Sequence, residues 1–126
     1  MDVKEAVIAF LQARNAFTRT LQEVVDNGSE VVFRHKDFDH VVIISETLSV
    51  VSSEGKTTVA CLNTEENVSF LVAHWEEFLQ PGLSVLFMNP FVQQQWKVVP
   101  LIHDRVADKK TLREGLMSLF SQVPAC

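Results

Sequence analysis

Cysteine, glycine and proline are scarce in this chain of 126 residues, which has two, four and four of them, and tyrosine is absent. The two cysteines, Cys61 and Cys126, cannot form the disulfide framework of a small secreted protein and do not have the spacing of a zinc site. Four glycines leave little material for a phosphate-binding loop, and neither that loop nor a dinucleotide fingerprint is present. These absences argue against the most easily recognised secreted, zinc-binding and nucleotide-binding classes.

An excess of bases and a long apolar run are also missing. Eleven Lys and Arg against sixteen Asp and Glu give a net charge of −5, which argues against general nucleic-acid binding. No apolar run approaches the ~20 residues that span a bilayer, so we expect no membrane partner. Asp2, Lys4 and Glu5 stand where a signal peptide would place its basic and apolar segments. We therefore expect a cytoplasmic protein.

Enough apolar material is present for a packed core, since 47% of the residues are hydrophobic and the mean hydropathy is +0.12. The length suits a single domain over residues 1–126. Apolar residues recur in steps of three and four from Val3 to Val24, which predicts an amphipathic helix over residues 2–26 that ends at Asn27 and Gly28. Such a helix is roughly 37 Å long. It exceeds what one sheet needs, so part of it is expected to contact a partner.

The rest of the chain alternates between runs typical of strands and of helices. A middle helix is predicted from Asn63, three residues before Glu66 as in a capping box, to the residue before Pro81, and a last helix opens at Thr111 in the same way. Turns are expected at 36–39 and 53–56, both as hairpin loops. Strands are predicted at 31–34, 41–45, 48–52, 57–62, 83–88 and 94–103. The predicted fold is α+β, a mostly antiparallel sheet of about six strands with a long N-terminal helix, a middle helix and a C-terminal helix, in the order αββββαββα.

This order of elements is broadly similar to that of small acidic homodimeric secretion chaperones, with one strand more. Charge is also uneven along the chain, because residues 37–96 hold eight acids and only one base, Lys56, whereas residues 97–126 carry a net +2. Such asymmetry can steer a partner or pair two copies, although a solvated surface is the simpler interpretation, because surface charge is the default.

The favoured hypothesis for function is a binding or interaction module, a homodimer without catalytic activity or cofactor. Arg14 interrupts the apolar stripe of the first helix, where a charge is costly unless it reaches a partner or water. The predicted interface lies on this helix: Val3, Val7, Phe10, Arg14 and Phe17.

A second hypothesis is a small-ligand-binding protein with a pocket between sheet and helices. Tryptophan and methionine are enriched at binding surfaces, although core packing is the commoner role for such residues. The residues predicted to line this pocket are Trp75, Phe87, Met88 and Trp96.

The third hypothesis is a small hydrolase or metal-dependent enzyme. Two imidazoles, His35 and His40, lie in one turn with two carboxylates, although their spacing matches no recognised metal site. Cys61 with His103 and Asp104 would supply a nucleophile, a base and an orienting acid if the fold brought them together. A polar loop and a buried, inert thiol are the simpler interpretations, so no catalytic or metal-binding residue is predicted.

Overall fold

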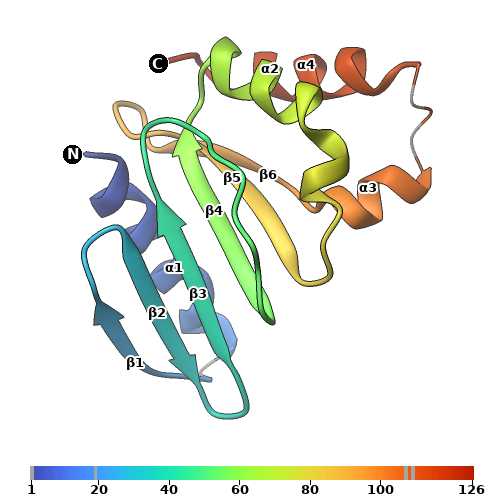
Figure 1. Cartoon of the computed structure of the whole chain (residues 1–126). Coiled ribbons are helices and arrows are strands. Elements are labelled where there is room, and N and C mark those ends of the chain that lie inside the picture. Colours follow the sequence, from blue (N-terminus) through green and yellow to red (C-terminus); the bar gives the residue numbers. More distant parts are fainter. Residues whose placement is uncertain (1, 19, 107, 109) are drawn as a thin grey trace.

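A computed structural model describes residues 2–18, 20–106, 108 and 110–126 of the chain, without the side chains of residues 15–18 (Figure 1). It confirms the α+β class: helices pack on a six-stranded sheet. In chain order the elements are α1 (Val3–Thr18), β1 (Leu21–Asp26), β2 (Glu30–His35), β3 (Asp39–Ile44), β4 (Lys56–Leu62), α2 (Glu65–Ala73), the 3₁₀ helix η1 (Trp75–Phe78), β5 (Leu83–Asn89), β6 (Gln94–Val98), α3 (Pro100–Val106) and α4 (Leu112–Ser121). None of the described helices is long and apolar enough to cross a membrane.

The strands are ordered in the sheet as they are in the chain, from β1 to β6. Strands β1, β2 and β3 form an antiparallel meander, and β5 and β6 are also antiparallel. The two central pairs, β3 with β4 and β4 with β5, are parallel. The sheet is therefore mixed, and the expectation of a mostly antiparallel sheet holds only for its outer pairs.

The predicted helix over residues 2–26 is too long, since its last part, residues 21–26, is a strand. Asp2 caps α1, since its Oδ1 accepts a hydrogen bond from the Glu5 backbone N–H at 2.8 Å, and the helix ends at Thr18. Residues 21–26 form β1 instead, paired with β2. Asn27 and Gly28 join two strands rather than capping a helix, and Gly28 has the positive φ of +90° that such a tight hairpin turn needs.

The predicted strand at 48–52 and the hairpin loop at 53–56 are also wrong. Because β3 and β4 are parallel, the chain between them must run back along the sheet before β4 begins. Residues 45–55 do this without forming a strand, and Leu48 on this crossover is buried. The side chain of Asn67 holds the crossover in place: its Oδ1 accepts from the Leu48 N–H at 2.9 Å and its Nδ2 donates to the Glu46 carbonyl at 2.8 Å.

Three further boundaries differ from those predicted. The middle helix, expected to reach the residue before Pro81, ends as α2 at Ala73, and the 3₁₀ helix η1 follows it. The cap of α2 is Thr64 rather than Asn63, because the Thr64 hydroxyl accepts from the Asn67 N–H at 3.1 Å. The strand expected over 94–103 ends at Val98, and Pro100 opens α3. Proline suits the first helical position, where its missing N–H is not needed.

The helices divide between the two faces of the sheet, with α1 on one face and α2, α3 and α4 together on the other (Figure 1). Alternate residues of the central strands serve the two sides, so that Val59 and Phe87 lie in the core under α2 and α4, while Ala60 and Leu86 lie in the core under α1. The two faces are therefore covered differently. One face is covered by α2, η1, α3, α4 and the crossover, and the other by the sixteen-residue helix α1.

Candidate functional site

The side chains on the α1 face change from apolar to polar along each of the central strands. In β3 the sequence along this face is His40, Val42, Ile44, and α1 packs on the apolar end. Two positions before the apolar residues Ala60 and Leu86, strands β4 and β5 carry Thr58 and Ser84. The polar positions form a row across the sheet at one end of α1, and a cavity opens above it.

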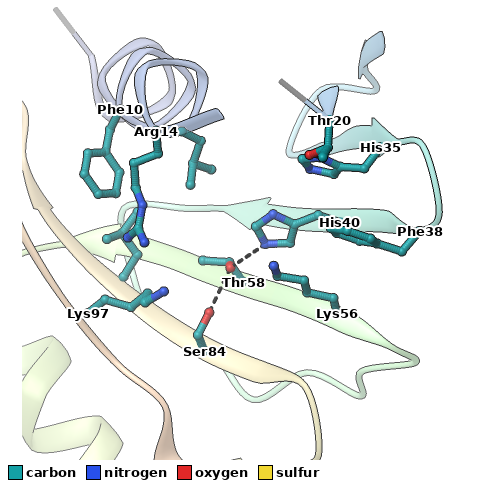
Figure 2. Close-up of a pocket in the computed structure, with 12 residues that line it drawn as sticks. Phe10, Arg14, Thr20, His35, Phe38, His40, Lys56, Thr58, Ser84 and Lys97 are labelled. Atoms are coloured by element: carbon teal, nitrogen blue, oxygen red, sulfur yellow. Dashed lines mark hydrogen bonds between the residues drawn. The ribbon is translucent and has the colours of Figure 1, made fainter. Parts of the chain in front are cut away.

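A continuous chain of hydrogen bonds runs through this row. His40 Nε2 lies 2.7 Å from the hydroxyl of Thr58, which lies 2.8 Å from the hydroxyl of Ser84 (Figure 2). His40 and Thr58 are buried, whereas Ser84 is half-buried and lines the cavity. Burial, together with the charge of Lys56, lowers the pKa of His40 to about 4. His40 is therefore a neutral imidazole at physiological pH, able to donate from one ring nitrogen and accept at the other.

Three cations converge on the same space from three elements. Arg14 reaches toward it from α1, Lys56 from the start of β4 and Lys97 from β6 (Figure 2). Arg14 lies over the ring of Phe10 at 5.8 Å and Lys56 over the ring of Phe38 at 4.9 Å. These aromatic faces attract the cations without neutralising them.

No carboxylate is present among the described side chains that line the cavity. The ion pairs of the described residues also lie elsewhere, at Lys4 with Asp26, Arg34 with Glu23 and His74 with Glu77. The pKa of Lys97 is lowered by partial burial and then by the nearby charges of Arg14 and Lys56. The cavity thus concentrates positive charge that the described part of the chain leaves uncompensated.

The cavity has a volume of about 410 Å³ and a wall of mixed character. His35 and Phe38 stack at one end, with ring centroids 4.4 Å apart, and the Thr20 hydroxyl lies 2.9 Å from His35 Nδ1. Phe10 and Leu86 supply apolar surface. A cavity of this size that combines apolar walls with a few convergent polar groups is typical of a small-molecule site.

The residues of the predicted interface occupy different environments. Val3 and Val7 are buried in the core between α1 and the sheet, so the domain itself uses these side chains. Phe10 and Arg14 line the cavity, and the side chain of Phe17 lies outside the described residues. Whether α1 also contacts a second copy stays a prediction.

The residues of the predicted pocket do not line one common space. Trp75, Phe87 and Trp96 belong to the core under α2 and α4, where Phe87 and Trp96 stack with centroids 4.2 Å apart. Met88 points to the opposite face, into the core under α1. Both indole N–H groups are engaged, that of Trp75 by Asp104 at 2.9 Å and that of Trp96 by the Asn63 side chain at 2.7 Å.

The residues behind the hydrolase hypothesis lie in three places: the core, the contact between α3 and Trp75, and the cavity. Cys61 is fully buried, and burial raises the pKa of its thiol well above the ordinary range, which makes a thiolate unfavourable. Asp104 accepts from Trp75, and His103 packs edge-on against the same ring. Over the described residues, no group of three His, Cys, Asp or Glu side chains is placed to hold a metal ion. His35 and His40, in contrast, both line the cavity.

Among the residues of this site that the sequence-based reasoning missed are two lysines and two hydroxyl residues: Lys56, Lys97, Thr58 and Ser84. A signal for Ser84 exists, because it is the one polar residue within the apolar run 83–88. Lys56 is the one base among residues 37–96. The sequence alone does not give the strand register, which brings these residues together on three neighbouring strands, β4, β5 and β6.

Comparison with known proteins adds no assignment, since no family model, no curated protein and no solved structure matches this chain.

Proposed function

We propose that this protein binds a small anionic molecule in the cavity on the α1 face of its sheet. One observation carries the proposal: Arg14, Lys56 and Lys97 converge on one cavity whose described lining contains no carboxylate. All three residues are exposed, so water and salt weaken their mutual repulsion, but like charges that face one cavity still raise the free energy of the unliganded protein. A bound anion removes this cost, so the arrangement favours binding.

The proposal belongs to the second of the sequence hypotheses, a small-ligand binder, but it uses a different pocket. The cavity lies on the opposite face of the sheet from Trp75 and Trp96. Two groups of the third hypothesis, His35 and His40, enter it as neutral polar lining rather than as metal ligands. The interaction module and the homodimer stay predictions beside this one, since the cavity does not test them.

Calorimetric titration of the purified protein with small organic anions tests the proposal. Phenyl phosphate and benzoate are suitable probes, with phenethylammonium as a cation of similar size. We expect at least one anion to bind, the cation not to bind, and the affinity to fall as salt is added, because added ions screen the cationic cluster.

Two charge-removing variants locate the site. We expect Arg14→Gln and Lys97→Gln each to weaken binding about tenfold or more, since each removes a charged partner of the anion. Arg113→Gln is the matched control, because Arg113 is an exposed base on α4, on the other face of the sheet. Failure of both anions to bind, or equal losses in Arg113→Gln and Arg14→Gln, would contradict the proposal.

A further inference from the structure

This inference rests on the proposed function: the number of charges in the cavity indicates which class of anion binds there. Three permanent or near-permanent cations face one space, and the two imidazoles beside them are neutral because the pKa of each is lowered by burial. A singly charged carboxylate would leave most of this positive charge uncompensated. A phosphate monoester carries close to two negative charges at neutral pH and offers three terminal oxygens to donors. The number of cations therefore favours a phosphate over a carboxylate.

The hydrogen-bond chain bears on which uncharged group contacts the anion. Thr58 has one hydroxyl proton and two partners, His40 Nε2 and the Ser84 hydroxyl. If Thr58 donates to His40, Ser84 must use its own proton on Thr58 and presents only lone pairs to the cavity. If His40 Nε2–H donates to Thr58, the Thr58 proton is released to donate to Ser84, and the Ser84 proton can then point into the cavity. Only this second direction lets Ser84 offer a donor to an anion.

We infer that the cavity binds a phosphate monoester, with the Ser84 hydroxyl donating to a phosphate oxygen and the His40–Thr58 pair directing that donation. Ser84 contacts the ligand in this arrangement, whereas His40 and Thr58 are positioning residues that act through it. The carrier of the phosphate is organic, because Phe10, Leu11 and Leu86 leave an apolar part of the wall that inorganic phosphate would not cover.

Selectivity among probes tests the ligand class. In titrations of the wild-type protein under one buffer, we expect phenyl phosphate to bind about tenfold or more tightly than benzoate, which has the same ring and one negative charge. We also expect phenyl phosphate to bind more tightly than inorganic phosphate, because only the former covers the apolar wall. Benzoate binding as tightly as phenyl phosphate would overturn the inference and leave the proposed function standing. No binding of either probe would overturn both.

Variants of the chain test the roles of the hydroxyls. Ser84→Ala removes the donor, and we expect it to weaken phenyl phosphate binding about tenfold, the loss typical of a hydrogen bond to a charged group. Thr58→Val keeps the shape of the side chain but breaks the chain of hydrogen bonds, and we expect a smaller loss that Thr58→Ser restores. Thr57→Val is the matched control, since Thr57 is the adjacent buried residue of β4 and its side chain points to the other face. Unchanged affinity in Ser84→Ala would overturn the assigned contact.

The tautomer of His40, that is, which ring nitrogen carries the proton, distinguishes a positioning role from a purely structural one. We expect ¹⁵N spectra of the wild-type imidazole to show a proton on Nε2 when phenyl phosphate is bound. In Thr58→Val, we expect the position of the proton not to change when phenyl phosphate is added. A saturated complex in which His40 Nε2 carries no proton would overturn the proposed direction of the chain, whatever the affinities are.

Discussion

Arg14 breaks the apolar stripe of the first helix, and the cavity gives this break a physical reason. A charge on a core-facing stripe is tolerated where it reaches water or a partner, and Arg14 lies at the end of α1 that extends past the apolar part of the sheet. Ser84 is a similar exception within an apolar strand. Such interruptions were visible in the sequence as isolated facts. Their meaning depends on the register that places them together.

His40 makes the stability of the unliganded protein depend on pH. Burial and the nearby cations Lys56 and Lys97, with His35, lower its pKa in the folded state from about 6.5 to about 4, while Asp39 acts in the opposite sense on His35. The unfolded chain therefore binds more protons than the folded protein between these two values, so stability falls as the pH falls through this window. The contribution of His40 is at most about 3 kcal/mol.

Urea unfolding at about pH 7 and about pH 5 measures this dependence. We expect the wild type to lose stability on acidification and His40→Gln to lose clearly less, because glutamine does not titrate. Equal slopes in the wild type and His40→Gln would show that this buried imidazole is not the titrating group.

At the scale of elements, the sequence predicted those that depend on local patterns. The β2–β3 hairpin at residues 36–39 and the last helix appear close to their expected places, and the middle helix appears as the shorter α2 followed by η1. The errors concern segments whose structure depends on distant strands. Leu21, Val24 and Val25 fit a helical stripe as well as a strand, and only pairing with β2 decides between them. Residues 48–52 have the composition of a strand but no strand beside them.

The junction where the crossover enters β4 depends on two glycines. Both have positive φ, +80° at Gly55 and +78° at Gly82, but a Cβ on Gly82 would lie 2.6 Å from the carbonyl oxygen of Gly55, whereas a Cβ on Gly55 meets nothing within 4 Å. The backbones approach so closely because the Thr57 N–H donates to the Gly82 carbonyl at 3.0 Å, which begins the parallel pairing of β4 and β5.

Alanine substitution at these two positions separates backbone strain from close approach. Gly55→Ala should cost about 1–2 kcal/mol, the strain of a positive φ alone. Gly82→Ala carries the same strain and also forces the two backbones apart, so we expect a further loss of about 1–3 kcal/mol. Chemical denaturation of both variants gives the comparison. If Gly82→Ala costs no more than Gly55→Ala, the close approach at this junction is not needed for stability.

At the scale of the whole molecule, the uneven charge along the chain becomes a difference between the two faces of the sheet. Four of the eight acids in residues 37–96 lie on α2 and η1, on the face opposite the cavity: Glu65, Glu66, Glu76 and Glu77. The one base of that segment, Lys56, lies in the cavity. The sheet lies between these acids and the cavity, so they are not placed to neutralise its cations by direct contact. A net charge of −5 is therefore compatible with a local site for anions.

The part of the first helix that could form the predicted homodimer contact is smaller than the sequence indicated. The argument for it began with a helix of 25 residues, but α1 has 16, and two members of its predicted seam, Val3 and Val7, are buried within the domain. Of the described members, Phe10 is half-buried and Arg14 is exposed. A dimer through α1 therefore depends on Phe10 as its large apolar anchor.

Sedimentation velocity over a range of protein concentrations tests this dimer. The prediction is a wild-type dimer that Phe10→Glu converts to a folded monomer, because the substitution removes the apolar anchor and places at the contact a carboxylate that would have to lose its water. Val106→Glu is the matched control, since Val106 is highly exposed on α3, on the other face of the sheet, and its replacement should leave the mass unchanged. A wild type that is monomeric at the highest concentration, or a dimer that Phe10→Glu leaves intact, would show that α1 packs only on its own sheet. In that case Phe10 has one role left on this face, as part of the cavity wall beside Arg14.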